Sequence, residues 1–488
     1  MSTRWRKDIL VAILSVIGLF FFLGARGLNE PDEGRFAEAS REMSVNSDWL
    51  IPRLAGVPHL QKPPMIFWIS AASLRIFGVN EWAARLPSAL AALGTILLTM
   101  HLAGLLFGRD VSWLSGLILL SNAFFFGMAR IITTDMLLCF WITAAVVFFV
   151  QYTINHQAWA LALFYTSLGF GFLTKGPIAY LIPLCAVIPW SIAWRRRSGA
   201  ANRPAHWGLG LLLSLAIGFS WFIALFRQHP ELMTYYLRHE FLDRIASNVH
   251  ARAKPFWFYS AVTLGGLLPW SLLIPRMVGS MLRLRPLLGS PVRWLFAGWL
   301  ILPWIVLHAV TSKLPTYVLP LFPPLAIALS WHIIRRLAAP KHTMRWAIIG
   351  CLMLALQMIL ASQADRFLIP LGRTTTDIVA SIRAVKRNHP DARIFALKER
   401  KYSLDFYLQE PILRLAQTAE KTLPIPEEVR SLYIEDPLQF LRDHRELDIV
   451  IVTPMATRTN AYVNDWIPVS THRKSAVFLR PRVAAKEN

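Results

Sequence analysis

The sequence is poor in charged residues and in cysteine. Asp, Glu, Lys and Arg make up 16% of its 488 residues, whereas about 25% is usual for a soluble chain. This composition argues against an ordinary water-soluble enzyme. The three cysteines, Cys139, Cys185 and Cys351, fall inside apolar runs, so no disulfide framework is expected. Glycine-rich ligand loops and metal-finger spacings are also missing, which leaves out the sites that these motifs mark.

Long apolar runs dominate what is present. Hydrophobic residues make up 55% of the chain, and runs of about 20 apolar residues, each long enough to cross a bilayer as a helix, recur along the first three quarters. This pattern predicts an all-α polytopic membrane protein with about eleven spans. The expected spans lie near 9–25, 85–107, 111–129, 136–154, 158–174, 177–194, 207–226, 256–275, 294–310, 316–333 and 345–362. The basic start and the apolar run to Leu23 resemble a signal peptide, but the many later spans favour an uncleaved first span.

The charge pattern predicts the orientation of these spans. The basic residues near the N-terminus favour a cytoplasmic N-terminus, because cytoplasmic loops carry an excess of Lys and Arg. The span count then places the basic segments 195–197, 276–293 and 335–345 in the cytoplasm as well. Much of the net charge of +22 (51 Lys and Arg against 29 Asp and Glu) lies in such short loops, so we expect no binding to nucleic acid.

The remaining segments fall on the opposite side, which is the periplasm in a Gram-negative type of cell. We expect a transmembrane domain at 1–362, including periplasmic loops at 26–84 and 227–255. A small α/β domain at 363–488 would follow in the periplasm, with a helix at 376–387 and strands at 393–397, 448–453 and 476–479. In the first loop, 29–43 reads as a helix that Asn29 or Glu30 caps and Pro31 opens.

Three lysines stand just before prolines that can open helices: Lys62-Pro63, Lys175-Gly176-Pro177 and Lys313-Leu314-Pro315. A helix N-terminus offers unpaired N–H groups and a partial positive charge, and a lysine adds a full charge beside it. On the predicted topology all three lysines face the periplasm, which predicts a phosphate site. Tyr317, one helical turn past Lys313, would present its hydroxyl there. The alternative is that each lysine only extends its ammonium group to the lipid headgroups.

Acidic residues on the same predicted side are candidates for catalysis. Asp32 and Glu33 stand in the first turn of the loop helix, followed by Arg35, and Asp135 begins a span beside Arg130. A helix N-terminus stabilises ionised carboxylates, and ionisable residues at a membrane boundary are candidate functional residues. The alternatives are an ordinary acidic first turn and a helix cap provided by Thr134 or Asp135.

Weaker candidates lie in the other periplasmic segments. Arg238 and Arg244 in the loop 227–255 are candidate anion-binding residues, or they only keep the loop solvated. His59, His239 and His250 form no recognisable ligand spacing, so no metal site is predicted.

A series of motifs occurs in a familiar order. They are Asp32-Glu33-Gly34-Arg35-Phe36-Ala37-Glu38, Lys62-Pro63-Pro64, Phe77-Gly78-Val79, Arg85-Leu86-Pro87-Ser88-Ala89, Thr134-Asp135, Thr174-Lys175-Gly176-Pro177, Leu268-Pro269-Trp270 and Ser312-Lys313-Leu314-Pro315-Thr316-Tyr317. With these motifs the chain resembles the integral-membrane glycosyltransferases of the GT-C type. It is most similar to the aminoarabinose transferases of lipid A and their protein O-mannosyltransferase relatives, a group like glycosyltransferase family 39. The resemblance covers roughly residues 1–330, whereas the C-terminal segment matches only in general character.

The resemblance implies a reaction and roles for several residues. It implies a sugar donor on a polyprenyl phosphate carrier, usually undecaprenyl phosphate, and inverting transfer at the periplasmic face of the inner membrane. Asp32 would be central, Asp135 would support it, and Lys62 would contact the carrier phosphate. We add Glu33 as a catalytic candidate. The further substrate-binding candidates are Lys175, Lys313, Tyr317, Arg35, Arg130, Arg238, Arg244 and His59.

The physical chemistry of such a transfer agrees with these roles. Cations held near helix N-termini stabilise the growing charge of a leaving phosphate. If the acceptor is a hydroxyl, Asp32 would take its proton. If the acceptor is an ionised phosphate, Asp32 would orient groups or stabilise positive charge developing on the sugar. We expect the three lysines and Asp32 to converge on one cavity that opens to the outer leaflet.

The sequence departs from the aminoarabinose transferases at positions that bear on metal and acceptor. Phe36 stands where those enzymes usually have tyrosine. His59 and Gln61 stand where they often have an aromatic residue and a glutamate associated with zinc, so a divalent metal is not supported here. The acceptor is left open among lipid A or another envelope lipid, another glycan and a protein hydroxyl. A transporter or flippase for a polyprenyl lipid is the alternative from another class, although no internal repeat supports it.

Overall fold

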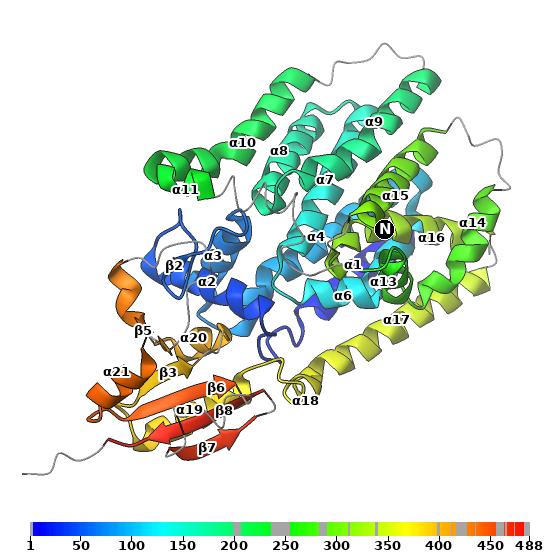
Figure 1. Ribbon diagram of the computed structural model, residues 1–488. Coiled ribbons are helices and arrows are strands. Elements are labelled where there is room, and N and C mark those ends of the chain that lie inside the picture. The colour runs from blue at the N-terminus through cyan, green and yellow to red at the C-terminus, as the bar shows by residue number, and fades with distance from the viewer. Residues whose placement is uncertain are drawn as a thin grey trace, which may run out of the picture. The chain divides into compact units, whose positions relative to one another are not determined.

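The computed structural model describes most of the chain (Figure 1). The described residues are 3–198, 206–235, 254–282, 290–310, 313–336, 340–397, 401–410, 412–415, 427–434, 436–454, 463, 466–472 and 474–482. They form two compact units. The membrane unit comprises 1–23, 61–66 and 85–360, and the second unit comprises 24–60, 67–84 and 361–488. Most of the predicted first loop is therefore grouped with the C-terminal segment and not with the spans.

The membrane unit is built from helices, whose bounds are as follows. They are α1 (Thr3–Phe20), α4 (Glu81–Phe107), α5 (Arg109–Leu120), α6 (Ala123–Ala129), α7 (Thr134–Asn155), α8 (Ala158–Lys175), α9 (Ile178–Ser198), α10 (Trp207–Gln228), α11 (Pro230–Tyr235), α13 (Phe258–Gly266), η2 (Trp270–Leu273), α14 (Ile274–Leu282), α15 (Pro291–Ala309), η4 (Pro315–Leu321), α16 (Phe322–Arg336) and α17 (Pro340–Ser362). The first four residues of α4 lie in the second unit.

The span count is lower than the prediction from sequence. Within the described residues, seven helices are long and apolar enough to cross a membrane, or nine if each of two bent helix pairs is one span. The bent pairs are α5 with α6 and α13 with the segment 270–279. Helices α1 and α8 form where spans were expected but are not among the seven, and α1 begins with several charged residues. A multi-span membrane protein is confirmed, whereas eleven spans are not.

Small residues allow the helices of the membrane unit to approach closely. Helices α7, α8, α9 and α10 run side by side (Figure 1). A Cβ atom at Gly298 on α15 would lie 1.9 Å from the carbonyl oxygen of Cys185 on α9. A Cβ atom at Gly210 on α10 would lie 1.9 Å from the Tyr165 ring on α8. Glycine at these two positions lets backbone and ring atoms meet, as is typical of membrane helix interfaces.

The second unit combines segments from the first loop with the C-terminal part. Its helices are α2 (Asp32–Asn46), α3 (Met65–Phe77), α18 (Ala364–Leu368), α19 (Thr376–Asn388), α20 (Ser403–Leu408), η5 (Glu427–Leu432) and α21 (Pro437–Asp443), although α3 begins within the membrane unit. Its strands are β1 (Arg53–Leu54), β2 (Val57–Pro58), β3 (Arg393–Leu397), β4 (Leu413–Leu415), β5 (Tyr433–Ile434), β6 (Ile449–Pro454), β7 (Ile467–Thr471) and β8 (Ser475–Arg480).

The C-terminal part is a six-stranded sheet, so the predicted α/β character is confirmed. Its strand order is β5-β4-β3-β6-β8-β7. The first four strands are parallel to one another, and β8 pairs antiparallel with both of its neighbours, β6 and β7. Alternate residues of β3 enter different cores: Ile394 and Ala396 pack with α19, and Phe395 and Leu397 pack with α21. This alternation reflects the two-residue period of a strand buried on both faces.

Two of the predicted helix caps are wrong. The loop helix α2 begins at Asp32, and its N-cap residue is Pro31, which makes no side-chain capping bond. Glu30 contacts the C-terminal segment instead. At α7 the cap is Thr133, whose side chain accepts the N–H of Asp135, and not Thr134 or Asp135. Glu30 and Asp135 instead contact residues that are distant along the chain.

Candidate functional site

The membrane unit brings together side chains from three helix ends. Lys175, the last residue of α8, forms an ion pair with Asp135 in the first turn of α7. The Lys175 ammonium group also lies 4.6 Å from the centre of the Tyr317 ring on η4. The side chains of Lys175 and Asp135 are 13% and 11% exposed. A cation is therefore held between a carboxylate and an aromatic face, and it is not extended toward the lipid headgroups.

The segment that carries Tyr317 contains a second buried lysine. Lys313 is 4% exposed, and its ammonium group donates to the carbonyl oxygen of Val310. Pro315 opens η4, which is a 3-10 helix that leads into α16. Tyr259 on α13, which packs against η4, is fully buried. The predicted lysine motifs at 175 and 313 thus belong to neighbouring segments.

The remaining candidates in the membrane unit have other surroundings. The Arg130 guanidinium donates to the carbonyl oxygens of Gly18 and Leu19, both at 3.0 Å, and so holds the end of α6 to α1. Lys62 is half-buried in the turn before α3. Arg238 and Arg244 lie outside the described residues.

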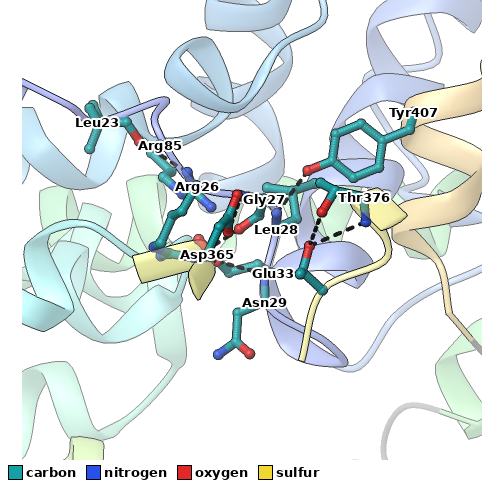
Figure 2. Close-up of polar contacts among 11 residues, drawn as sticks. Leu23, Arg26, Gly27, Leu28, Asn29, Glu33, Arg85, Asp365, Thr376 and Tyr407 are labelled. Carbon is teal, nitrogen blue, oxygen red and sulfur yellow. Dashed lines mark hydrogen bonds and ion pairs between the residues drawn. The ribbon is translucent and has the colours of Figure 1, made fainter. Parts of the chain in front are cut away.

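In the second unit, the two acidic residues that begin α2 differ in burial. The Asp32 side chain is 62% exposed and pairs with Arg35, one turn along the helix. The Glu33 side chain is fully buried, pairs with Arg26 at 2.6 Å and accepts the N–H of Asn29 at 2.8 Å (Figure 2). Asp32 is therefore open to a reactant, whereas Glu33 fixes the chain before the helix.

Further acidic residues of α2 are buried and hydrogen-bonded. Glu38 is 1% exposed and accepts two bonds from Arg41, at 2.7 and 2.6 Å. Glu42 accepts the N–H groups of Ala55 and Gly56, at 2.6 and 3.0 Å. Burial raises the pKa of both carboxyl groups above the usual glutamate value, although these partners oppose the shift.

A buried ion pair from the C-terminal segment acts on the same residues. Both carboxylate oxygens of Asp405 accept from Arg414, at 2.7 and 2.8 Å. The Asp405 charge also acts on Glu38 and Glu42. Glu38, Arg41 and Glu42 are three and four positions apart, so they lie on one face of a helix. This spacing could have predicted a polar face whose members interact with one another. Nothing local in the sequence pointed to Asp405 or Arg414 as their neighbours.

The histidine candidate does not fit a metal site. His59 is 5% exposed, and its ring meets the edge of Phe67 with a centroid distance of 6.1 Å. Across the described part of the chain, no group of three His, Cys, Asp or Glu side chains is placed to hold a metal ion. With Gln61 in place of a glutamate, the residues present here do not fit the zinc site that the resemblance implies for the relatives.

Several known proteins similar to this chain are named as transferases. Residues 61–223 match the family described as dolichyl-phosphate-mannose-protein mannosyltransferase. The undecaprenyl phosphate-alpha-4-amino-4-deoxy-L-arabinose arabinosyl transferase of Edwardsiella ictaluri is 33% identical over 67% of this chain and 59% of its own length. A protein of the same name, numbered 1, from Pseudomonas fluorescens is 30% identical over 70% of this chain and 62% of its own length. The chain thus spans about three fifths of the length of these curated relatives.

Solved structures share the fold over a longer stretch. ArnT from Cupriavidus metallidurans bound to undecaprenyl phosphate matches with a TM-score of 0.77 and 22% identity, covering 99% of both chains. The oligosaccharyltransferase of Archaeoglobus fulgidus in its apo form matches with a TM-score of 0.60 and 10% identity, over 93% of this chain and 70% of its own. At these identities the matches establish a shared fold.

Proposed function

We propose that this chain, a GT-C-type relative of the aminoarabinose and protein mannosyl transferases, moves a sugar from a polyprenyl phosphate carrier to an envelope acceptor. The relatives' names support an undecaprenyl phosphate donor. The resemblance of the sequence motifs makes a lipid such as lipid A the first acceptor to test. The enzyme would act at the periplasmic face of the inner membrane. The eleven-span topology and a periplasmic C-terminal segment are part of this proposal.

The observation that carries the proposal is the burial of two lysines in the membrane unit. Lys175 is held by Asp135 and Tyr317, and Lys313 lies on the segment that carries Tyr317. Cations inside a membrane protein are costly and typically mark binding or transport sites. Because their ammonium groups are already fixed, they can stabilise the charge that grows on a leaving phosphate without reorganisation.

In the proposed reaction, the bond between the anomeric carbon and the carrier phosphate breaks, and the phosphate leaves with the electron pair. The acceptor oxygen forms the new bond from the opposite face, which inverts the anomeric carbon. Lys175 and Lys313 would stabilise the phosphate, with Lys62 as a third cation. Asp135 would hold Lys175 in place, and Tyr317 would contact the donor.

Asp32 is our candidate for the group that receives the acceptor proton. It is the exposed member of the acidic pair, and it forms an ion pair with Arg35. Glu33 is already engaged by Arg26 and Asn29, so its catalytic role stays a prediction. Roles for Arg130 and His59 in substrate binding also stay predictions. The expected convergence of Asp32 with the lysines stays a prediction as well.

Donor binding tests the lysines directly. Purified protein in lipid nanodiscs would be titrated with undecaprenyl phosphate and followed by native mass spectrometry. We expect Lys175→Met and Lys313→Met each to weaken binding by about tenfold or more, because each loses one charge-assisted contact. Lys386→Met is the matched control, since Lys386 pairs with Glu410 in the C-terminal segment. Equal affinity of all three variants and the parent chain would refute the phosphate site.

A second experiment identifies the reaction. Lipids and glycans from envelopes of cells with and without the chain would be compared by mass spectrometry, followed by transfer assays with lipid, glycan and peptide acceptors. A sugar that appears on one acceptor only with the active chain supports a transferase. Movement of intact donor lipid across the membrane without sugar transfer would instead support a flippase.

A further inference from the structure

The chain just before α2 is held by residues from the C-terminal segment (Figure 2). The N–H of Gly27 donates to both carboxylate oxygens of Asp365, at 3.0 and 3.2 Å. The N–H of Leu28 donates to the hydroxyl oxygen of Tyr407 at 2.8 Å. These contacts join residues more than 300 positions apart within one compact unit. The start of α2 is therefore fixed by partners outside its own loop.

Glu30 makes the most buried of these connections. Glu30 is 7% exposed, and its Oε1 atom accepts the N–H of Ser403 at 2.8 Å. Its own N–H donates to the carbonyl oxygen of Arg373 at 2.7 Å. Gly34, one turn along from Glu30, packs against the same bond, because a Cβ atom there would lie 2.5 Å from Oε1 and 2.8 Å from the Ser403 nitrogen.

We propose that Glu30 is a positioning residue, which ties the first turn of α2 to the C-terminal segment and thereby orients Asp32. The inference rests on the proposed function, in which Asp32 receives the acceptor proton. Glu30 is only two positions before Asp32, and it is bonded to the C-terminal segment through both its backbone and its side chain. The C-terminal segment thus acquires a role in the reaction without supplying a reacting group.

Protonation of Glu30 gives the connection a pH dependence. Burial raises the pKa of Glu30 to about 7, and the Asp405 charge adds to this shift. The hydrogen bonds with Ser403 and the Lys401 charge oppose it. Since the ordinary value is 4.5, folding favours the protonated form. The associated stability is complete below about pH 4.5 and is lost as the pH rises through about 7. Above that pH, the buried charge lowers the stability of the fold around Glu30.

Two substitutions at Glu30 separate positioning from folding. Glu30→Gln keeps an oxygen that accepts from Ser403 and cannot ionise, so we expect kcat near the parent value at pH 6 and a smaller fall between pH 6 and 8. Glu30→Ala removes the bond, and we expect kcat to fall about tenfold while KM for the donor stays within twofold. Glu410→Gln, the same change at a half-exposed residue paired with Lys386, should alter none of these values.

Hydrogen exchange of the α2 amides provides a readout that does not depend on the assigned reaction. Glu30→Ala should speed exchange in a peptide that covers 31–38, whereas Glu410→Gln should not. If the parent chain transfers no sugar but Glu30→Ala still loosens α2, the proposed function fails and the structural connection stands. If Glu30→Ala leaves α2 exchange unchanged, or slows transfer no more than Glu410→Gln does, the positioning role is refuted.

Discussion

Neutralising the Asp135–Lys175 ion pair in two steps distinguishes a catalytic role from a structural one. Asp135→Asn leaves the Lys175 ammonium buried without its carboxylate, and Lys175→Met leaves the Asp135 carboxylate buried without its cation. The double variant buries neither charge. A double-mutant cycle of unfolding free energies therefore isolates the interaction between the two groups.

The structure sets the expected size of these effects. Removing one partner of a buried pair costs about 3–5 kcal/mol, because the other charge is left unpaired. The side chains retain 11% and 13% exposure, which favours the lower end, about 3 kcal/mol for each single variant. The double variant leaves no charge unpaired and should cost only about 1 kcal/mol, so the coupling should exceed about 3 kcal/mol.

Unfolding in SDS and sugar transfer would be measured on the same preparations. If the pair also serves the reaction, the double variant should regain most of the stability lost in the single variants but remain about 100-fold or more slower than the parent chain. The matched control is Lys386→Met with Glu410→Gln, a pair with side chains 24% and 33% exposed, whose coupling should not exceed about 1 kcal/mol.

The outcome that refutes this reasoning is clear. If transfer by the double variant recovers together with stability, Asp135 and Lys175 only hold α7 and α8 together. If the coupling free energy is no larger than that of the exposed control pair, burial does not determine the strength of the Asp135–Lys175 interaction.

Three other substitutions have distinct expected outcomes. Glu33→Gln loses the ion pair with Arg26 and should lower the unfolding free energy by about 3 kcal/mol, as measured by SDS unfolding. Glu33→Asp should recover little of this free energy, because its shorter side chain cannot reach the same partners. Arg414→Met leaves Asp405 buried without the cation that donates to both its carboxylate oxygens. The second unit should therefore lose about 3–5 kcal/mol of unfolding free energy, detectable as faster hydrogen exchange in the β3–β4 region. Gly298→Ala places a Cβ atom 1.9 Å from a backbone carbonyl oxygen of α9 and should separate α15 from α9, measurable as a lower thermal midpoint than for Gly279→Ala, where nothing lies within 4 Å.

Local sequence was enough to predict the class of the protein. Long apolar runs indicate membrane helices whatever their partners are, because each run satisfies its own backbone hydrogen bonds. The strand prediction at 393–397 matches β3, and the helix prediction at 376–387 matches α19 to within one residue. Short strands such as β4 and β5 were missed because two or three residues carry too little periodicity.

The sequence was also enough to name several candidate residues, but it did not predict their interaction partners. The lysine motifs, Asp32 and Asp135 could be named from residue type and spacing. Forty residues separate Asp135 from Lys175, and no local pattern pairs them. The predicted count of eleven spans is not confirmed within the described residues, and hydropathy also did not register the bend between α5 and α6.

Tertiary structure alone decided which acidic residue is buried and which is open. Asp32 and Glu33 are adjacent carboxylates in the same helical turn, so propensity and charge treat them alike. Successive residues point in directions about 100° apart around a helix, and packing within the second unit buries Glu33 against Arg26 while Asp32 remains exposed. The sequence by itself determined that an acidic helix and three lysines just before helix-opening prolines exist. Long-range packing determined their environments, because burial depends on atoms that are distant along the chain.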